Sequence, residues 1–187
     1  MSKAVPLILD ASVLINFLNV DRLEPLATAL PFRLTVTQHV GLEIRTEYGE
    51  QLARFRHAMK AEWLTEMRID DLIVQAEIVK FAADARVGLG ESSAIVLASR
   101  MSSPVAIDDN RAIRKGLELC PMLEVFRTED LVVQLIRAGA LTAQEADALK
   151  ELWRTQHRFA LKVRSFADLL GTPSTRPPAP TRRPKRP

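Results

Sequence analysis

The sequence predicts an α/β fold with a central, mainly parallel sheet of five strands and additional helices at the C-terminal end. Short aliphatic runs alternate with longer segments whose apolar residues recur at helical spacing. The runs show no polar alternation, which is typical of strands buried on both faces of a parallel sheet. Because strand and helix alternate, right-handed βαβ units are expected, with the most aliphatic strands in the centre.

Each element follows from its own pattern. Aliphatic runs predict strands at residues 5–9, 32–36, 63–67, 104–107 and 123–126. Helices are expected between them at 11–19, 23–30, 39–47, 51–60, 70–85, 91–100 and 111–118. From residue 128 the pattern is helical only, with helices at 128–138, 142–158 and 166–170. Pro31, Gly49 and Gly139 mark helix ends, and Thr142 with Glu145 forms a capping box.

These patterns divide the chain into three parts: a sheet domain at 1–127, a helical extension at 128–171 and a disordered Pro/Arg-rich tail at 172–187. The formal net charge of +3 comes from the tail, which holds five basic residues and no acid after residue 172. Without them the chain has 21 basic and 23 acidic residues, so overall basicity says little about the folded part. The tail could bind RNA through its charge or merely keep the chain in solution.

Composition excludes several classes of protein. No apolar run approaches the roughly 20 residues that span a bilayer, and the N-terminus lacks the pattern of a signal peptide. A single cysteine excludes an intramolecular disulfide and a thiolate zinc cluster. With 47% hydrophobic residues the chain can bury a core. We therefore expect a cytoplasmic protein with no membrane association.

Acidic residues stand where predicted elements begin or end on one side of the sheet. They are Asp10 after the first strand, Glu43 in the helix after the second, Glu91 at the start of a small-residue helix, and Asp108-Asp109 after the fourth strand. Ligands of open α/β sheets bind beyond the carboxyl ends of the strands, which is where these acids would meet. Like charges brought together repel, and a hard divalent cation such as Mg²⁺ relieves that repulsion.

Simpler interpretations exist for most of these acids. Asp10 could cap the following helix, and the Asp108-Asp109 pair could form a turn and cap the helix at 111–118. Glu43 and Glu47 could form an exposed helix face, and only one of the two need point inward. If the acids do converge, a bound metal would activate water for hydrolysis of a phosphodiester. Ser12 and Asn16 could then orient Asp10 or a metal-bound water.

Four motifs in order resemble those of PIN-domain ribonucleases. They are Leu-Asp-Ala-Ser-Val-Leu-Ile at 9–15, Val-Gly-Leu-Glu-Ile at 40–44, Gly-Glu-Ser-Ser-Ala-Ile at 90–95 and Ile-Asp-Asp-Asn-Arg-Ala at 107–112. The resemblance covers about residues 5–127 and implies a three-layer α/β/α fold with a Mg²⁺ or Mn²⁺ site. By that resemblance the metal ligands and catalytic acids are Asp10, Glu43, Glu91 and Asp109, with Asp108 able to replace or assist Asp109.

The resemblance implies an endoribonuclease, plausibly the toxin of a VapC-like type II toxin–antitoxin pair that an antitoxin protein inhibits. We also expect a homodimer. The alternative is a catalytically inactive PIN-like module that binds RNA or a partner protein. A different α/β phosphohydrolase is a further alternative, but it would normally carry a second Asp at position 12, which is Ser. Basic residues on helices could touch phosphates, although a solvated face is favoured for most of them: Arg54, Arg56, Lys60, Arg111, Arg114 and Lys115.

Overall fold

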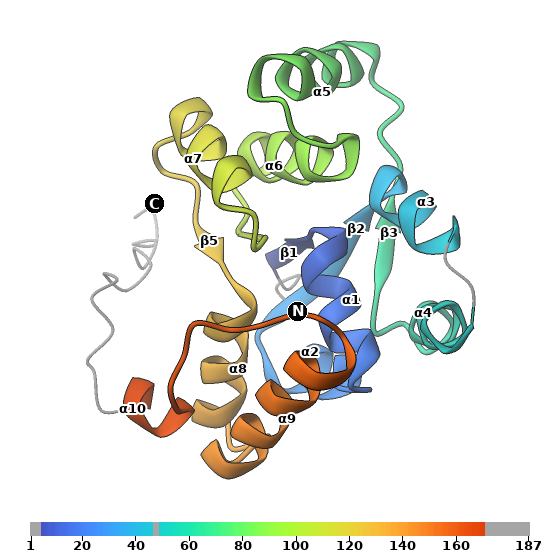
Figure 1. Ribbon diagram of the computed structural model, residues 1–187. Helices are drawn as coiled ribbons and strands as arrows, with labels where there is room; N and C mark the ends of the chain where they lie inside the picture. The colour runs from blue at the N-terminus through green and yellow to red at the C-terminus, as the bar shows by residue number, and fades with distance from the viewer. Residues whose placement is uncertain (1–4, 47–48, 171–187) are drawn as a thin grey trace, which may run out of the picture.

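The computed structural model describes residues 5–46 and 49–170 (Figure 1). Its sheet has five parallel strands in the order β3-β2-β1-β4-β5. The strands are β1 (Val5–Leu9), β2 (Phe32–Thr37), β3 (Thr65–Met67), β4 (Val105–Ala106) and β5 (Val125–Phe126). The predicted α/β class and five-stranded parallel sheet are thus confirmed, with the aliphatic first strand in the centre.

Three strands are shorter than the sequence predicts. β4 covers two residues where four are expected, and β3 and β5 also begin later. Hydrogen bonding nevertheless continues beyond β4, because Ile8 N–H donates to the Pro104 carbonyl at 3.0 Å and Ile107 N–H to the Phe126 carbonyl at 2.9 Å. The aliphatic run therefore marks the whole paired segment rather than the regular strand alone.

The helices agree with the predicted ones to within about two residues at most ends. They are α1 (Ala11–Asn19), α2 (Leu23–Ala29), α3 (Gln38–Thr46), α4 (Glu50–Lys60), α5 (Leu72–Ala85), α6 (Leu89–Met101), α7 (Asn110–Leu119), α8 (Thr128–Arg137), α9 (Ala143–Gln156) and α10 (Phe166–Leu170). The predicted capping box is present: Glu145 N–H donates to Thr142 Oγ1 at 3.1 Å, and Thr142 N–H to Glu145 Oε2 at 2.7 Å.

The sheet separates two hydrophobic cores, which gives three layers. Leu7 and Leu9 of β1 face one core, and Ile8 faces the other, as strand alternation requires. Helices α5, α6 and α7 pack on the Ile8 side, and α6 is the most buried of them, with residues 92–98 all buried. Helices α1–α4 and α8–α10 pack on the opposite face (Figure 1). The three-layer α/β/α arrangement is confirmed.

The C-terminal helices share the core of the Leu7 side. Trp153 of α9 is fully buried, lies edge-on to Phe17 of α1 at 6.1 Å between ring centroids, and donates from Nε1 to the Asn16 carbonyl at 2.8 Å. Phe166 of α10 is also fully buried in this core. Where the domain ends along the chain stays a prediction. The predicted disordered tail at 172–187 and Glu47 lie outside the described residues.

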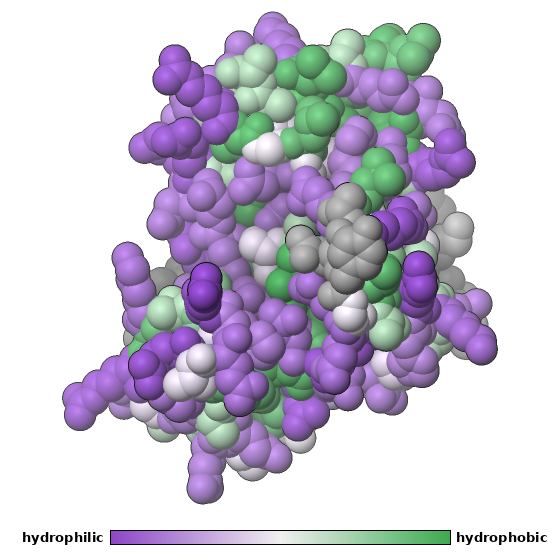
Figure 2. Space-filling view, turned by 45° about the vertical axis from the view of Figure 1, so that its right-hand side comes forward, coloured by the Kyte–Doolittle hydropathy of each residue, from purple (hydrophilic) through white to green (hydrophobic). Residues whose placement is uncertain are grey.

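Helix α5 has an exposed apolar face. Leu72, Ile73 and Val79 are 77%, 68% and 60% exposed. Figure 2 shows hydrophobic surface over this helix at the top of an otherwise largely hydrophilic face. No helix within residues 5–46 and 49–170 is both long and apolar enough to cross a membrane.

Candidate active site

The candidate site lies where the strand order reverses between β1 and β4. The chain passes from β1 outward to β2 and β3, then returns to β4 on the other side of β1. Asp10 N–H donates to the Ala106 carbonyl at 2.9 Å, so the residues that follow β1 and β4 leave the sheet side by side. Ligands of open α/β sheets bind in the crevice at such a switch point.

Asp10 is 2% exposed and both caps α1 and keeps one oxygen unbonded. Its Oδ2 accepts hydrogen bonds from Ser12 N–H at 3.1 Å and from Ser12 Oγ–H at 2.6 Å. Its Oδ1 is buried and has no hydrogen-bond partner. Burial raises the pKa of this carboxyl, and the charge of Asp108 adds to the rise, while the bonds from Ser12 oppose it. Helix capping therefore explains the contacts of Oδ2 but gives no role to Oδ1.

The two adjacent aspartates after β4 have different surroundings. Both oxygens of Asp108 are bonded: Thr128 donates from N–H to Oδ1 at 2.9 Å and from Oγ1 to Oδ2 at 2.7 Å. Asn16 Nδ2 also donates to Asp108 Oδ2, at 3.2 Å. Asp109 is exposed and caps α7, with Oδ1 accepting from Ala112 N–H at 2.7 Å. One of the pair was expected to cap this helix, and Asp109 does so.

Glu43 and Glu91 come together at the start of α6. Glu43 Oε1 accepts from Gly90 N–H at 3.1 Å, and Glu91 Oε2 accepts from Gly88 N–H at 2.8 Å. A Cβ at position 90 would lie 2.3 Å from Glu43 Oε1, so a larger residue there would displace the Glu43 carboxylate from its present position.

The pKa values of both glutamates reflect this shared surrounding. Burial raises the pKa of Glu43, with further contributions from the charges of Asp10 and Glu91. Burial also raises the pKa of Glu91, helped by the charges of Asp10 and Asp109 and opposed by the bond from Gly88. The predicted acids Asp10, Glu43, Glu91, Asp108 and Asp109 therefore act on one another electrostatically.

Several site residues were missed in the sequence. Thr128 is fully buried and binds Asp108, and Asn16 Nδ2 donates to Thr128 Oγ1 at 3.1 Å as well as to Asp108. Asn16 thus contacts Asp108, where the sequence suggested Asp10 or a water. Glu129 has a raised pKa, first through burial and then through the charges of Asp108 and Asp130. Thr128 and Glu129 follow β5, so the strand-end rule that identified Asp10 could also have identified them.

The donor atoms suit a hard divalent cation in part. Mg²⁺ is usually held by one or two carboxylates and keeps several waters. The buried, unbonded Oδ1 of Asp10 is such a donor, and cations relieve the mutual repulsion that raises the neighbouring pKa values. Among the residues that the structure describes, no three His, Cys, Asp or Glu side chains lie close enough together to hold one ion. Two carboxylates with waters fit this arrangement.

The raised pKa values predict how stability changes with pH. A carboxyl group whose pKa is higher in the folded chain stabilises the fold fully below its unfolded pKa, near about 4, and this contribution is lost as the pH rises through the folded pKa. Asp10→Asn removes one such group. We expect the free energy of unfolding of this variant to rise relative to that of the unaltered chain as the pH increases from about 4 to 7. Urea unfolding in EDTA at several pH values measures the difference, and parallel curves would contradict the expectation.

One solved structure and one family model are similar to this chain. The crystal structure of PAE2754 from Pyrobaculum aerophilum is similar at a TM-score of 0.48 and 17% identity, over 74% of this chain and 92% of that one. No curated protein sequence matches the chain. The PIN-domain family model DUF3368 matches residues 6–167, which include every acid discussed above and helices α8 and α9. PIN domains are mostly nuclease domains and commonly bind Mg²⁺. The chain belongs to the PIN-domain family.

Proposed function

We propose that this protein is a metal-dependent endoribonuclease that hydrolyses phosphodiester bonds of RNA with Mg²⁺ or Mn²⁺. The observation that carries the proposal is the buried, unbonded Oδ1 of Asp10 at the switch point of the sheet. A carboxylate oxygen without a partner costs several kcal/mol of desolvation unless something pairs with it, which favours a site built for a cation. Burial raises the pKa values of Asp10, Glu43 and Glu91, and the charges of neighbouring acids add to the rise.

In this proposal two of the three carboxylates of Asp10, Glu91 and Asp109 bind the cation directly, waters fill its remaining positions, and Glu43 lies beside them. Asp108 serves to hold the start of α8 against β4, because both of its oxygens are already bonded by Thr128 and Asn16. When bound, the cation would activate a water and offset negative charge on the transferring phosphate. This assignment gives the two adjacent aspartates separate roles.

The chain's own side chains would hold the carboxylates in place and accept the proton of the attacking water. Ser12 fixes the orientation of Asp10 through two hydrogen bonds to Oδ2, which leaves Oδ1 facing the site. The hydrogen bond from Gly88 N–H holds the Glu91 carboxylate, and the one from Gly90 N–H holds the Glu43 carboxylate of α3 against the first turn of α6. A carboxylate next to the cation can accept the proton of an attacking water, and Glu43, which lies beside the proposed ligands, suits that step.

The alternative function is a PIN-like module that binds RNA or a protein without cleaving. One observation favours it: within residues 5–46 and 49–170 no three acidic or other metal-binding side chains are close enough to share an ion. The metal dependence of cleavage separates the two functions.

A toxin role, an antitoxin partner and a homodimer are also proposals. The exposed apolar side chains Leu72, Ile73 and Val79 of α5 support a protein partner, since exposed apolar patches commonly mark protein interfaces. A second copy of the chain or an antitoxin could cover them.

The proposal is tested by incubating a labelled, structured RNA with the full chain in Mg²⁺, in Mn²⁺ and in EDTA. We expect internal cleavage with either metal and intact RNA in EDTA, because the acids lack a counter-charge without a cation. A DNA strand of the same sequence serves as the control for substrate class. RNA that stays intact with both metals would contradict the nuclease and leave the binding module. Equal cleavage in EDTA would contradict the metal dependence.

A further inference from the structure

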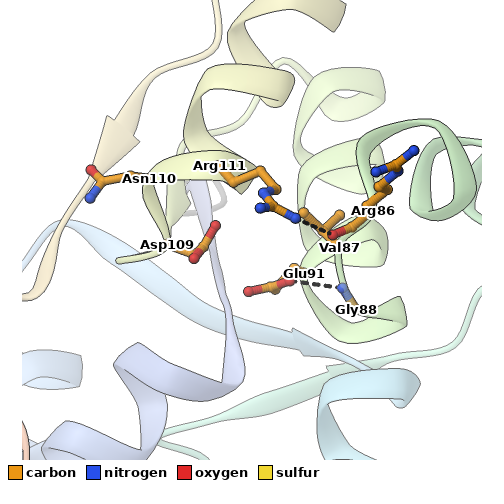
Figure 3. A pocket seen from close by; sticks show the side chains of 7 residues that line it. All are labelled: Arg86, Val87, Gly88, Glu91, Asp109, Asn110 and Arg111. Carbon is orange, nitrogen blue, oxygen red and sulfur yellow. Dashed lines mark hydrogen bonds between the residues drawn. The ribbon is translucent and has the colours of Figure 1, made fainter.

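A pocket of about 430 Å³ adjoins the carboxylates and includes two of them (Figure 3). It lies between the end of α5 and the starts of α6 and α7. Glu91 and Asp109 line it together with Gly88, Asn110, Arg111 and Arg86. Its volume falls within the range of about 300–1,000 Å³ typical of ligand pockets. A ligand that fills it must therefore continue into the carboxylate site.

The pocket brings opposite charges near each other without pairing them. Figure 3 shows the carboxylates of Glu91 and Asp109 pointing toward one another and the Arg111 guanidinium on the neighbouring wall. Arg111 donates from Nη1 to the Arg86 carbonyl at 3.4 Å, a long and weak bond. Within the described residues neither Arg86 nor Arg111 forms an ion pair with an acid. The wall with Glu91 and Asp109 thus suits a cation, and the wall with Arg111 suits an anion.

The backbone fixes where the guanidinium groups stand. Asp109 caps α7, which places Arg111 on the first turn of that helix, two residues from a site acid. Arg86 ends α5 in the left-handed conformation, with φ of 55°, and the chain then turns directly into Gly88 and α6. Arg86 points to the outer rim of the pocket in Figure 3, whereas Arg111 lies nearer the acids.

We propose that this pocket binds a backbone phosphate of a single RNA strand, adjacent to the phosphate that the carboxylates face. Arg111 is the main donor to that phosphate, and Arg86 adds charge at the rim. The inference rests on the function proposed above, because it takes RNA as the substrate. A guanidinium pairs with phosphate through several donors that lie in one plane. An arginine that is merely solvated on a helix surface would have no need to line a pocket.

The shape of the site favours nucleic acid over an acidic peptide. The pocket and the carboxylate site share Glu91 and Asp109, so one ligand must present negative charge to both at once. Successive phosphates along one strand do this by their covalent connection. With a cation on the carboxylates both walls attract anions, but an acidic peptide carries its charges on separate flexible side chains, so its backbone does not fix their spacing as a nucleic-acid strand does.

The experiment measures binding without cleavage. A 5′-hydroxyl RNA oligonucleotide, which carries only internal phosphates, is titrated in Mg²⁺ with the full chain carrying Asp10→Asn, and fluorescence anisotropy is followed at several salt concentrations. Arg111→Gln and the double variant Arg86→Gln/Arg111→Gln are introduced into this background. Arg114→Gln is the matched control: it removes the same charge from the same helix, one turn further on and outside the pocket lining.

We expect Arg111→Gln to weaken RNA binding about tenfold, and the double variant more. The slope of log affinity against log salt should fall by about one for each lost phosphate contact. Arg114→Gln should change both quantities by much less. Equal effects of Arg111→Gln and Arg114→Gln would overturn the proposal that the pocket binds a phosphate, and would indicate that RNA responds to the overall charge of α7. No effect of either would overturn it as well.

The outcome is separable from that of the nuclease proposal. Pocket-dependent RNA binding by a chain that never cleaves RNA would contradict the nuclease and support the pocket. Metal-dependent cleavage by the unaltered chain, combined with RNA binding that is unaffected by Arg111→Gln, would contradict the pocket alone. Melting curves of each variant exclude misfolding as the cause of lost binding.

Discussion

Asp10→Asn is expected to lower the rate of RNA cleavage by about a hundredfold or more, because it removes a charged donor from the proposed cation site. The free energy of unfolding at neutral pH should stay at or above that of the unaltered chain. Asn caps a helix as well as Asp and can still accept the hydrogen bonds from Ser12. The substitution also removes the charge of a carboxyl group whose pKa is raised by burial, so the folded chain no longer has to bury that charge. Single-turnover cleavage in Mg²⁺ and urea unfolding in EDTA measure the two effects.

The matched control is Asp21→Asn, in the turn just after the far end of the same helix. Asp21 is exposed and has a positive φ of 53°, a conformation that Asn tolerates. This variant should cleave RNA at the rate of the unaltered chain. If Asp10→Asn cleaved equally well, the assignment of Asp10 would be wrong. If it lost activity only because it unfolded, the urea data would reveal that and the role of Asp10 in chemistry would lose its support.

Trp153→Ala is expected to lower the free energy of unfolding by about 3–5 kcal/mol, the largest stability effect that we predict. Trp153 is fully buried between Phe17 and Phe159, with ring centroids 6.1 and 6.0 Å from its own. The substitution leaves a cavity and also removes the donor to the Asn16 carbonyl. Since Asn16 in turn donates to Asp108, we expect the site to loosen with the core. Urea unfolding followed by circular dichroism measures the change.

The comparison variant is Trp63→Ala, which truncates the other tryptophan. Trp63 is only partly buried and lies edge-on to exposed His57, so its loss should cost distinctly less. Equal losses for the two variants would contradict the view that α9 is part of the main core. A separate, earlier unfolding transition in the unaltered chain would show instead that the helices after residue 127 fold as their own unit.

Features that depend on residues close together in the sequence could be predicted from it. The aliphatic run at 5–9 identifies the central strand because Leu7, Ile8 and Leu9 are buried, and an unpaired polar side chain is costly in a strand that is covered on both faces. Asp10 was recognisable because the carboxyl ends of parallel strands meet at one edge of the sheet. The pairing of Asp108 could not be predicted, since its partners Thr128 and Asn16 are 20 and 92 positions away in sequence. Only the packing of α1 and α8 into the same core, on one face of the sheet, brings them together.

The same limit applies to the pocket. The sequence left Arg111 among six basic residues for most of which a solvated face was the favoured interpretation. What sets it apart is the left-handed turn at Arg86 and the cap at Asp109, which bring the ends of three helices together. Neither glutamate position could be fixed from periodicity either, because the bond from Gly90 to Glu43 spans 47 residues.

Calorimetric titration of Mn²⁺ into the metal-free full chain tests whether the acids around Asp10 form the proposed cation site. We predict saturable Mn²⁺ binding to the unaltered chain, with affinity about tenfold or more lower in Asp10→Asn and unchanged in Asp21→Asn. The melting temperature should rise with Mn²⁺ in the same order. Equal binding by all three chains, or no binding by the unaltered chain, would contradict the account.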